Sequence, residues 1–178
     1  MSAVCVYCSS SLTIDPSYVQ LATEVGERLA AAGHSLISGG GRVSMMGAVA
    51  RAARAGGAWT VGVIPEHLMP YEVADVEADE LIVVETMRER KRIMDTRGDA
   101  FLALPGGIGT LEELFEMWTS LSLGMHAKPV AVLDPDGLYE PLWRWLDDLV
   151  RRGFVRQEAL DTLARTTTVD EAFAALKL

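Results

Sequence analysis

Apolar residues in this chain follow two alternating patterns: short continuous runs, and longer stretches in which they recur every three or four positions. The short runs predict buried strands, and the spaced stretches predict helices with one apolar side. The expected strands occupy residues 3–8, 35–38, 59–64, 81–84, 100–104 and 128–133, with a further extended piece at 164–169. The expected helices occupy residues 16–32, 44–56, 86–97, 138–152 and 170–176, and one more begins at 109–110.

The regular alternation of strand and helix predicts one α/β domain that spans residues 1–178. A doubly wound sheet of this kind is open and parallel, carries helices on both faces, and binds ligands beyond the carboxyl ends of its strands. The segment between the third and fourth expected strands, residues 65–80, is polar and acidic and lacks clear periodicity. We expect it to be a surface excursion over one end of the sheet.

Two glycine turns follow expected strands. The first is Gly39-Gly40-Gly41, after which Ser44 can cap the next helix. The second lies in the stretch LPGGIGTLEELFE, from Leu104 to Glu116. Glycine lets backbone N–H groups approach a ligand closely, and a helix N-terminus carries partial positive charge. Both turns therefore predict the binding of an anion such as phosphate.

The acidic pair Glu112 and Glu113 has two explanations. Thr110 and Glu113 have the spacing of a capping box, in which the threonine caps the helix and the glutamate bonds back to it. Alternatively, Glu113 falls with Glu116 and Ser120 on the side away from the core, and so faces whatever the glycine turn holds. The position of the apolar stripe favours this second explanation. The stripe consists of Leu111, Leu114, Phe115, Trp118 and Leu121.

The helix expected at residues 86–97 is strongly basic. It holds five of the sixteen basic residues: Arg88, Arg90, Lys91, Arg92 and Arg97. At 100° per residue, Arg90 and Lys91 share a face with methionines, whereas Arg88 and Arg92 lie with Asp95 on another face. Charges on an apolar face need an anionic partner. We therefore expect Arg90 and Lys91 to lie in a ligand cleft, and Arg88 and Arg92 to be solvated.

Together these features describe a site for a phosphate and a sugar. A carboxylate beside a bound sugar can stabilise the oxocarbenium-like ion through which an N-glycosidic bond breaks, and water then captures that ion. Motifs for other chemistries are missing, because no Walker A lysine and no G-x-G-x-x-G is present and His34, His67 and His126 are scattered singly. We therefore expect a small-molecule ligand, no metal and no cofactor.

The composition also bears on whether the protein binds nucleic acid or a membrane. Sixteen basic and 25 acidic residues give a net charge of −9, which disfavours a nucleic-acid partner. Neither a membrane-spanning apolar run nor a cleavable N-terminal signal is recognisable, so we expect no membrane association and a cytoplasmic location. Cys5 and Cys8 point to opposite faces of an expected strand, so core positions are expected rather than a disulfide.

Four motifs give the chain a resemblance to a known family. PGGIGTLEE, MRERK upstream of it, SGGGRVSMMG, and VIPEHLMPYE between the last two resemble the Lonely Guy family of cytokinin-activating phosphoribohydrolases. Older members of that family were labelled lysine decarboxylase-like. The resemblance covers nearly the whole chain. It implies a Rossmann-like fold, a homodimer, and hydrolysis of N6-substituted AMP to the free base and ribose 5-phosphate.

The resemblance also assigns roles to individual positions. The family's catalytic arginine falls on Arg90 and its catalytic glutamate on Glu113. Many members of the family read Met-His-x-Arg-Lys at this motif, whereas Arg88 replaces the histidine here. Arg88 lies off the helix face that carries Arg90, so we expect activity to be retained. The change should alter nearby packing or substrate preference. The implied substrate contacts, together with the first glycine turn, are Glu72, Lys91, Gly107, Ile108, Gly109, Thr110, Leu111, Glu112, Thr119, Gly39, Gly40 and Gly41.

Two other functions compete with the hydrolase. A non-catalytic nucleotide carrier or sensor of similar fold would use the same glycine turns. Amino-acid decarboxylation would need a Schiff-base lysine for pyridoxal phosphate, for which Lys91 is the candidate. The presence of Glu113 beside Arg90 favours the hydrolase. An apolar cluster near the end of the Glu113 helix can be either a dimer surface or core: Met117, Trp118, Leu121, Leu123 and Met125.

Overall fold

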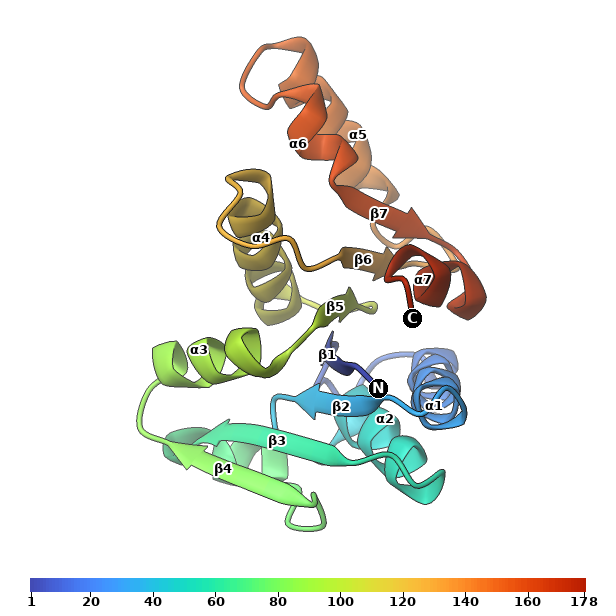
Figure 1. Ribbon diagram of the computed structural model, residues 1–178, viewed down its shortest axis with the longest axis vertical. Helices are drawn as coiled ribbons and strands as arrows, with labels where there is room; N and C mark the ends of the chain where they lie inside the picture. The colour runs from blue at the N-terminus through green and yellow to red at the C-terminus, as the bar shows by residue number, and fades with distance from the viewer.

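Seven parallel strands form one sheet in the computed structural model, which describes residues 1–178. Their order is β4-β3-β2-β1-β5-β6-β7 (Figure 1). The bounds are β1 (Ala3–Tyr7), β2 (Ser35–Ser38), β3 (Thr60–Pro65), β4 (Glu80–Val84), β5 (Ala100–Ala103), β6 (Val130–Leu133) and β7 (Leu163–Thr166). The predicted open parallel sheet is confirmed, and the extended piece near residue 164 is its seventh strand.

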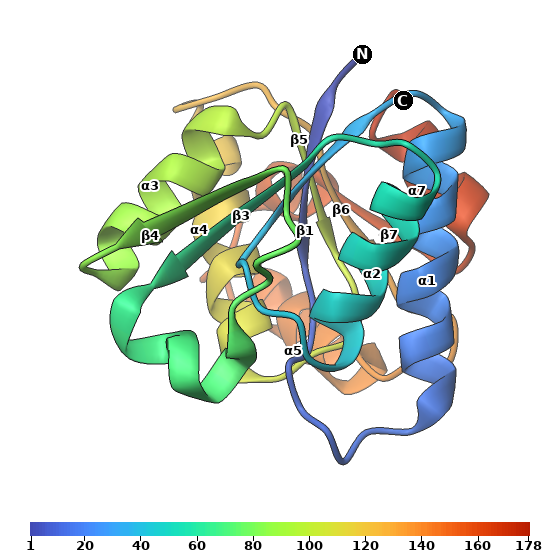
Figure 2. The ribbon, with the colours of Figure 1, turned by 90° about the horizontal axis from the view of Figure 1, so that it is seen from below.

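The helices form one layer on each face of the sheet, as expected for a doubly wound fold (Figure 2). Side chains of α1, α2 and α7 fill one hydrophobic core, and those of α3, α4 and α5 fill the other. The bounds are α1 (Pro16–Ala31), α2 (Ser44–Ala55), α3 (Met87–Arg97), α4 (Ile108–Ser122), α5 (Glu140–Arg151), α6 (Gln157–Asp161) and α7 (Val169–Ala175). The short helix α6 was not predicted. None of the helices combines the length and apolar character needed to cross a bilayer.

Strand β1 lies at the point where the strand order reverses. It pairs with β2 on one side and with β5 on the other. The chain leaves β1 towards α1 on one face of the sheet and leaves β5 towards α4 on the opposite face. Diverging connections of this kind leave a crevice beyond the carboxyl ends of the two strands. The sequences that border it are SSS after β1 and PGG after β5.

Two helix caps that the sequence allowed do not form: the capping-box alternative at Thr110 and the expected cap at Ser44. Helix α4 begins with Gly107 at its N-cap and has no side-chain cap, so Thr110 and Glu113 form no capping box. Thr110 lies buried inside the first turn and packs against Gly106. A Cβ added to Gly106 would lie 2.1 Å from Oγ1 of Thr110. Ser44 is the first residue of α2 rather than its cap. Its φ is +50°, and its hydroxyl donates to the Ser11 carbonyl at 2.5 Å.

The segment after β3 is more than the surface excursion that its composition suggested. It forms a short 3-10 helix, η1 (Glu66–Leu68), and one π-helical turn, η2 (Met69–Val73). The backbone N–H of Arg42 donates to the carbonyls of η2, and Gly41 bridges to the residue that follows it. Beyond η2, Arg54 forms an ion pair with buried Asp75 at 3.1 Å. These contacts fix η2 against the glycine turn after β2.

The two cysteines behave as their spacing predicted. Cys5 is buried in the core beneath α3, α4 and α5, whereas Cys8 packs against the core beneath α1, α2 and α7. Both are free thiols. They therefore serve as small apolar side chains on opposite faces of the sheet.

Candidate active site

A cavity of about 350 Å³ lies beyond the carboxyl ends of the central strands. Its walls come from the loop after β1, the glycine turn after β2, the segment η1–η2, helix α3 and the N-terminus of α4. This is the crevice expected where the strand order reverses.

Arg90 is buried in the wall of this cavity, with 4% of its surface exposed. Its Nε donates to the Val63 carbonyl at 3.1 Å, and its Nη2 donates to the Gly39 carbonyl at 2.8 Å. The same Nη2 forms an ion pair with Glu72 at 3.1 Å. The remaining nitrogen, Nη1, contacts only the Met87 sulfur, at 3.9 Å. The guanidinium is thus held in one orientation, and Nη1 remains for a ligand.

Gly39 makes this position of Arg90 possible. A Cβ on residue 39 would lie 1.9 Å from Nη2 of Arg90, far inside contact distance. Only glycine therefore allows the guanidinium to reach the carbonyl of this residue. The first glycine of the turn is explained by close packing, because its φ is not in the left-handed region.

Glu113 lines the same cavity from the second turn of α4 and is half-buried. Burial raises the pKa of its carboxyl from 4.5 to about 7. The positive charge of Arg90 acts in the opposite direction, whereas the negative charges of Glu112 and Glu72 raise the pKa further. Near neutral pH the group is therefore poised between its acid and carboxylate forms, and a positive charge nearby would favour the carboxylate.

The N-terminus of α4 presents unpaired backbone donors to the cavity. The first bond of the helix runs from the Leu111 N–H to the Gly107 carbonyl, so the N–H groups of residues 108–110 have no acceptor. The turn before the helix is held by Tyr139, whose hydroxyl lies 3.0 Å from the Leu104 carbonyl and 3.2 Å from that of Gly106. Fixed donors at a helix N-terminus suit a phosphate.

The cavity brings together most of the residues singled out from the sequence. Arg90 and Glu113 both line it, from α3 and α4 respectively. The other predicted residues that line it are Glu72, Gly39, Gly107, Ile108, Gly109, Thr110 and Glu112. Motifs that are far apart in the chain thus meet at one edge of the sheet.

Five predicted residues do not line the cavity: Gly40, Gly41, Lys91, Leu111 and Thr119. The two glycines are buried beneath η2, and the Gly40 carbonyl accepts from the Asp75 N–H at 2.8 Å. Leu111 packs on the core. Thr119 is exposed, about 14 Å further along α4 than Thr110 at 1.5 Å per residue.

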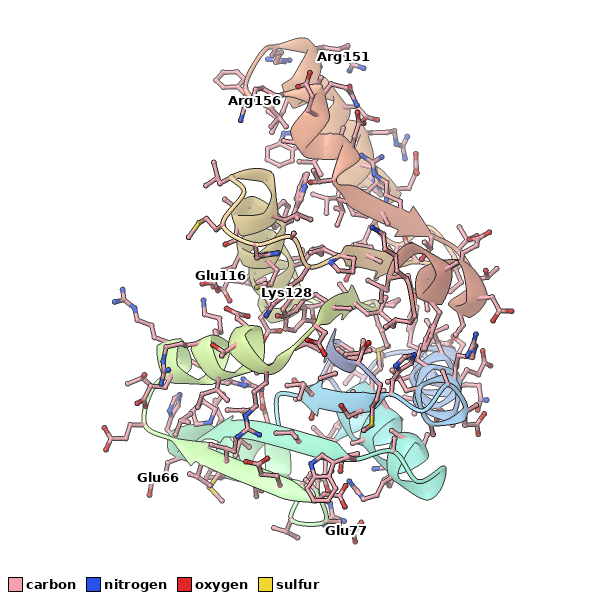
Figure 3. All side chains as sticks on the ribbon, viewed as in Figure 1. Glu66, Glu77, Glu116, Lys128, Arg151 and Arg156 are labelled. Atoms are coloured by element: carbon pink, nitrogen blue, oxygen red, sulfur yellow. The ribbon has the colours of Figure 1, made fainter.

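Lys91 lies between α3 and α4, away from the cavity. Its ammonium donates to Glu112 at 2.5 Å and forms an ion pair with Glu116 at 2.6 Å. Figure 3 labels Glu116 on the side of α4 that faces α3. Arg88 and Arg92 are exposed as predicted, but Asp95, which the helical wheel placed with them, is half-buried and accepts from the Tyr7 hydroxyl at 3.4 Å. The difference arises because this side of Asp95 faces β1, which carries Tyr7.

Sequence reasoning missed the loop after β1. Tyr7, Cys8 and the three serines that follow all line the cavity. A signal was present, because a loop at the carboxyl end of the central strand borders the crevice in a doubly wound sheet. The motifs alone do not give the strand order, however, and no motif in the loop stands out. Apolar contacts from Met46 and Leu68 were missed as well.

The arrangement combines three chemical functions within one small cavity. Unpaired N–H groups can hold an anion, a buried guanidinium offers a fixed positive charge, and Glu113 supplies a titratable carboxyl. Such a set suits a phosphorylated sugar whose reaction develops positive charge near a carboxylate.

Comparison with known proteins identifies the relatives of this chain. A family model described as "Possible lysine decarboxylase" matches residues 46–176. A Mycobacterium tuberculosis protein named cytokinin riboside 5'-monophosphate phosphoribohydrolase is 51% identical over 172 residues, which are 97% of this chain and 91% of that protein. The Oryza sativa protein named cytokinin riboside 5'-monophosphate phosphoribohydrolase LOG is 43% identical over 168 residues, 94% of this chain and 69% of that protein.

Solved structures with the same fold are more distant in sequence. The molybdenum cofactor carrier protein of Chlamydomonas reinhardtii superposes with a TM-score of 0.73 at 22% identity, covering 99% of this chain and 96% of that one. The molybdenum cofactor binding protein of Rippkaea orientalis gives 0.72 at 22% identity, covering 98% and 93%. These likenesses show the Rossmann-like fold alone. By the family model and the identity to its curated relatives, the chain belongs to the family of the cytokinin riboside 5'-monophosphate phosphoribohydrolases.

Proposed function

We propose that this chain hydrolyses the N-glycosidic bond of adenosine 5'-monophosphates, above all those substituted at N6, and releases the free base and ribose 5-phosphate. One observation carries the proposal: Arg90 and Glu113 line a single cavity at the N-terminus of α4. Relatives that are 50% and 51% identical bear the name of this activity.

The 5'-phosphate would bind at the start of α4. The N–H groups of residues 108–110 have no acceptor, and Ser9, Ser10 and Ser11 face the cavity from the opposite connection. Phosphate binding there uses hydrogen bonds and the helix dipole. The donors matter in a chain with net charge −9, because the protein as a whole repels anions.

The carboxylate of Glu113 would act at the sugar. As the bond between C1' and the base nitrogen breaks, the base leaves with the electron pair and takes a proton, and positive charge develops at the ring oxygen and C1'. A carboxylate that is already in place stabilises that charge. Water then bonds to C1', loses a proton and completes ribose 5-phosphate.

Arg90 would serve this reaction in two ways. Its charge favours the ionised form of Glu113, which is the form that stabilises the sugar cation. Its free Nη1 can donate to an oxygen of the substrate, while the bonds to Gly39 and Glu72 keep the guanidinium from moving. A guanidinium stays protonated, so the proton for the leaving base comes from water or another group.

Decarboxylation with pyridoxal phosphate is not supported by the position of Lys91. A Schiff-base lysine needs a free, easily deprotonated amine in the site. Burial lowers the pKa of Lys91, but hydrogen bonds with Glu112 and Glu116 outweigh it and raise the pKa overall. The amine also lies outside the cavity. The residues present therefore do not fit this cofactor.

A homodimer and a cytoplasmic location also belong to the proposal. Of the apolar cluster at the end of α4, Met117 and Trp118 are core, whereas Leu123 and Met125 are 64% and 74% exposed. Exposed apolar side chains favour contact with a second copy. Two free thiols without a disulfide are typical of proteins in a reducing compartment.

The test is a direct product assay. Purified protein is incubated with AMP and with isopentenyl-AMP, and free base and ribose 5-phosphate are measured together. Equal amounts of both products support the hydrolase. Tight binding of the nucleotides without release of base would instead support a carrier. The matched control is Glu158→Gln, an exposed glutamate on α6 that should leave turnover unchanged.

A further inference from the structure

The turn that joins β5 to α4 has every carbonyl occupied by a donor of the protein. Each carbonyl from residue 104 to residue 107 accepts a hydrogen bond. The donors are the Tyr139 hydroxyl for residues 104 and 106, the Ser9 N–H for residue 105 and the Leu111 N–H for residue 107. No carbonyl of the turn is therefore left to face an anion, which it would repel.

Tyr139 is itself fixed in place behind the turn. It stands at the N-cap of α5, is buried, and meets the Trp143 ring edge-on with the ring centroids 6.0 Å apart. The carboxylate of Asp134, just after β6, accepts from the backbone N–H of Tyr139 at 2.9 Å. Burial raises the pKa of the Tyr139 hydroxyl, so the group stays protonated and remains a donor.

The bond from Tyr139 determines which way the next peptide N–H points. A trans peptide unit is planar, and its C=O and N–H point in opposite directions. Because the Gly106 carbonyl points at Tyr139, the Gly107 N–H points away from it. Gly107 lines the cavity, Tyr139 does not, and the Gly107 N–H has no acceptor in the protein. A hydroxyl on one side of the turn thus orients a free donor on the other side.

Two consecutive glycines make this restraint necessary. Glycine adopts backbone conformations that other residues avoid, so a peptide between two glycines rotates easily. Gly106 packs closely on Thr110, but nothing lies within 4 Å of a Cβ built on Gly107. Packing therefore restrains only the first glycine. Half a rotation of the shared peptide would present a carbonyl to the cavity in place of the N–H.

We propose that Tyr139 is a positioning residue for the phosphate of the substrate: by holding the Gly106 carbonyl, it turns the Gly107 N–H into the cavity as a further anion donor. This donor adds to the unpaired N–H groups of residues 108–110. That the anion is a substrate phosphate rests on the proposed function, whereas the orientation of the peptide does not. Tyr139 acts through the backbone of the turn.

The experiment compares wild type with Tyr139→Phe, which keeps the ring and removes the hydroxyl. The matched control is Tyr18→Phe, because the Tyr18 hydroxyl donates to Asp136 at 2.6 Å outside the cavity. Binding of AMP and of adenosine is measured by calorimetry. In Tyr139→Phe the Kd for AMP should rise about tenfold, the effect of losing about one hydrogen bond to a charged group. Its Kd for adenosine, and both Kd values of the control, should stay at the wild-type values.

A purely structural role for Tyr139 would give a different result. Tyr139→Phe would then keep its affinity for AMP, or lose affinity for AMP and adenosine equally, and either result would overturn the inference. NMR of the wild-type protein decides the matter even if the variant does not fold. The Gly107 amide resonance should move when inorganic phosphate is added, and an unmoved resonance would also overturn the inference.

Steady-state kinetics separate this inference from the proposed function. If isopentenyl-AMP is hydrolysed and Tyr139→Phe retains the wild-type kcat/KM, the function stands and the inference fails. If nothing is hydrolysed but AMP binding weakens selectively in Tyr139→Phe, the proposed hydrolysis fails and the inference stands.

Discussion

Replacing Glu113 by glutamine should destroy activity and stabilise the fold at the same time. The variant keeps the size of the side chain and removes its charge. Turnover should fall roughly 10²-fold or more, the loss typical of one preorganised electrostatic contact. Folding should become more favourable because the carboxylate is held half-buried among other acids, where ionisation is costly.

The size and sign of the stability change follow from the pKa. Burial raises the pKa of the Glu113 carboxyl from 4.5 to about 7 in the folded protein. Because the folded value is the higher one, its contribution to stability is complete below about pH 4.5 and is lost as the pH rises to about 7. A shift of that size corresponds to about 3 kcal/mol, and partial exposure reduces it to roughly 1–3 kcal/mol. Glutamine should recover this amount above pH 7.

Thermal unfolding at pH 5 and pH 8.5 measures the effect. Glu113→Gln should be more stable than wild type at pH 8.5, by about 2–4 °C in Tm for each kcal/mol, and the difference should be much smaller at pH 5. Glu158→Gln should match wild type at both values. A Glu113→Gln protein that is less stable at pH 8.5, or whose gain is the same at both pH values, would refute the reasoning from burial.

Four further results are expected. Gly39→Ala should push Arg90 off its carbonyl, costing about 1–3 kcal/mol in urea unfolding together with most of the activity, since the new Cβ would lie 1.9 Å from Nη2. Arg90→Lys should lose activity as well, because one ammonium cannot reach the Val63 carbonyl, the Gly39 carbonyl and Glu72 together; normal steady-state rates would contradict this. Isopentenyladenosine should be hydrolysed about a hundredfold less efficiently than its 5'-monophosphate, and equal kcat/KM values would remove the phosphate site. Light scattering at micromolar protein should give the mass of a dimer, and a monomer mass would exclude it.

The sequence was sufficient for the fold because its strands are short, apolar and regularly separated. Parallel strands buried on both faces leave a strong pattern, and each of the six runs became a strand within one or two residues of its expected ends. Helix caps were predicted less well. Thr110 has the right chemistry and spacing for a cap, but it is buried against Gly106, and Gly107 takes the cap position. Tertiary packing excluded a cap that the local spacing allowed.

Some features of the site could be predicted from the sequence and others could not. Residues at strand ends and on an apolar helix face, such as Arg90 and Glu113, could be selected from position and chemistry. The partners of Arg90 could not, because they include the backbone carbonyls of Val63 and Gly39, which carry no sequence signal. Likewise, nothing in MRERK indicates that Lys91 turns towards α4 while its neighbour turns towards β3. That choice depends on which elements flank α3.

Helix α4 carries both its free N–H groups and Glu113 on one continuous stretch of backbone. The rise from Thr110 to Glu113 is about 4.5 Å at 1.5 Å per residue, and a hydrogen-bonded helix hardly stretches. An anion seated at the helix start would therefore be held at a constant distance from the carboxyl. The helix would thereby fix the distance between a terminal phosphate and the atom that reacts. Molecules with a longer phosphate chain could bind at the same donors, but their sugar would overshoot the acid, so length alone would exclude them from turnover.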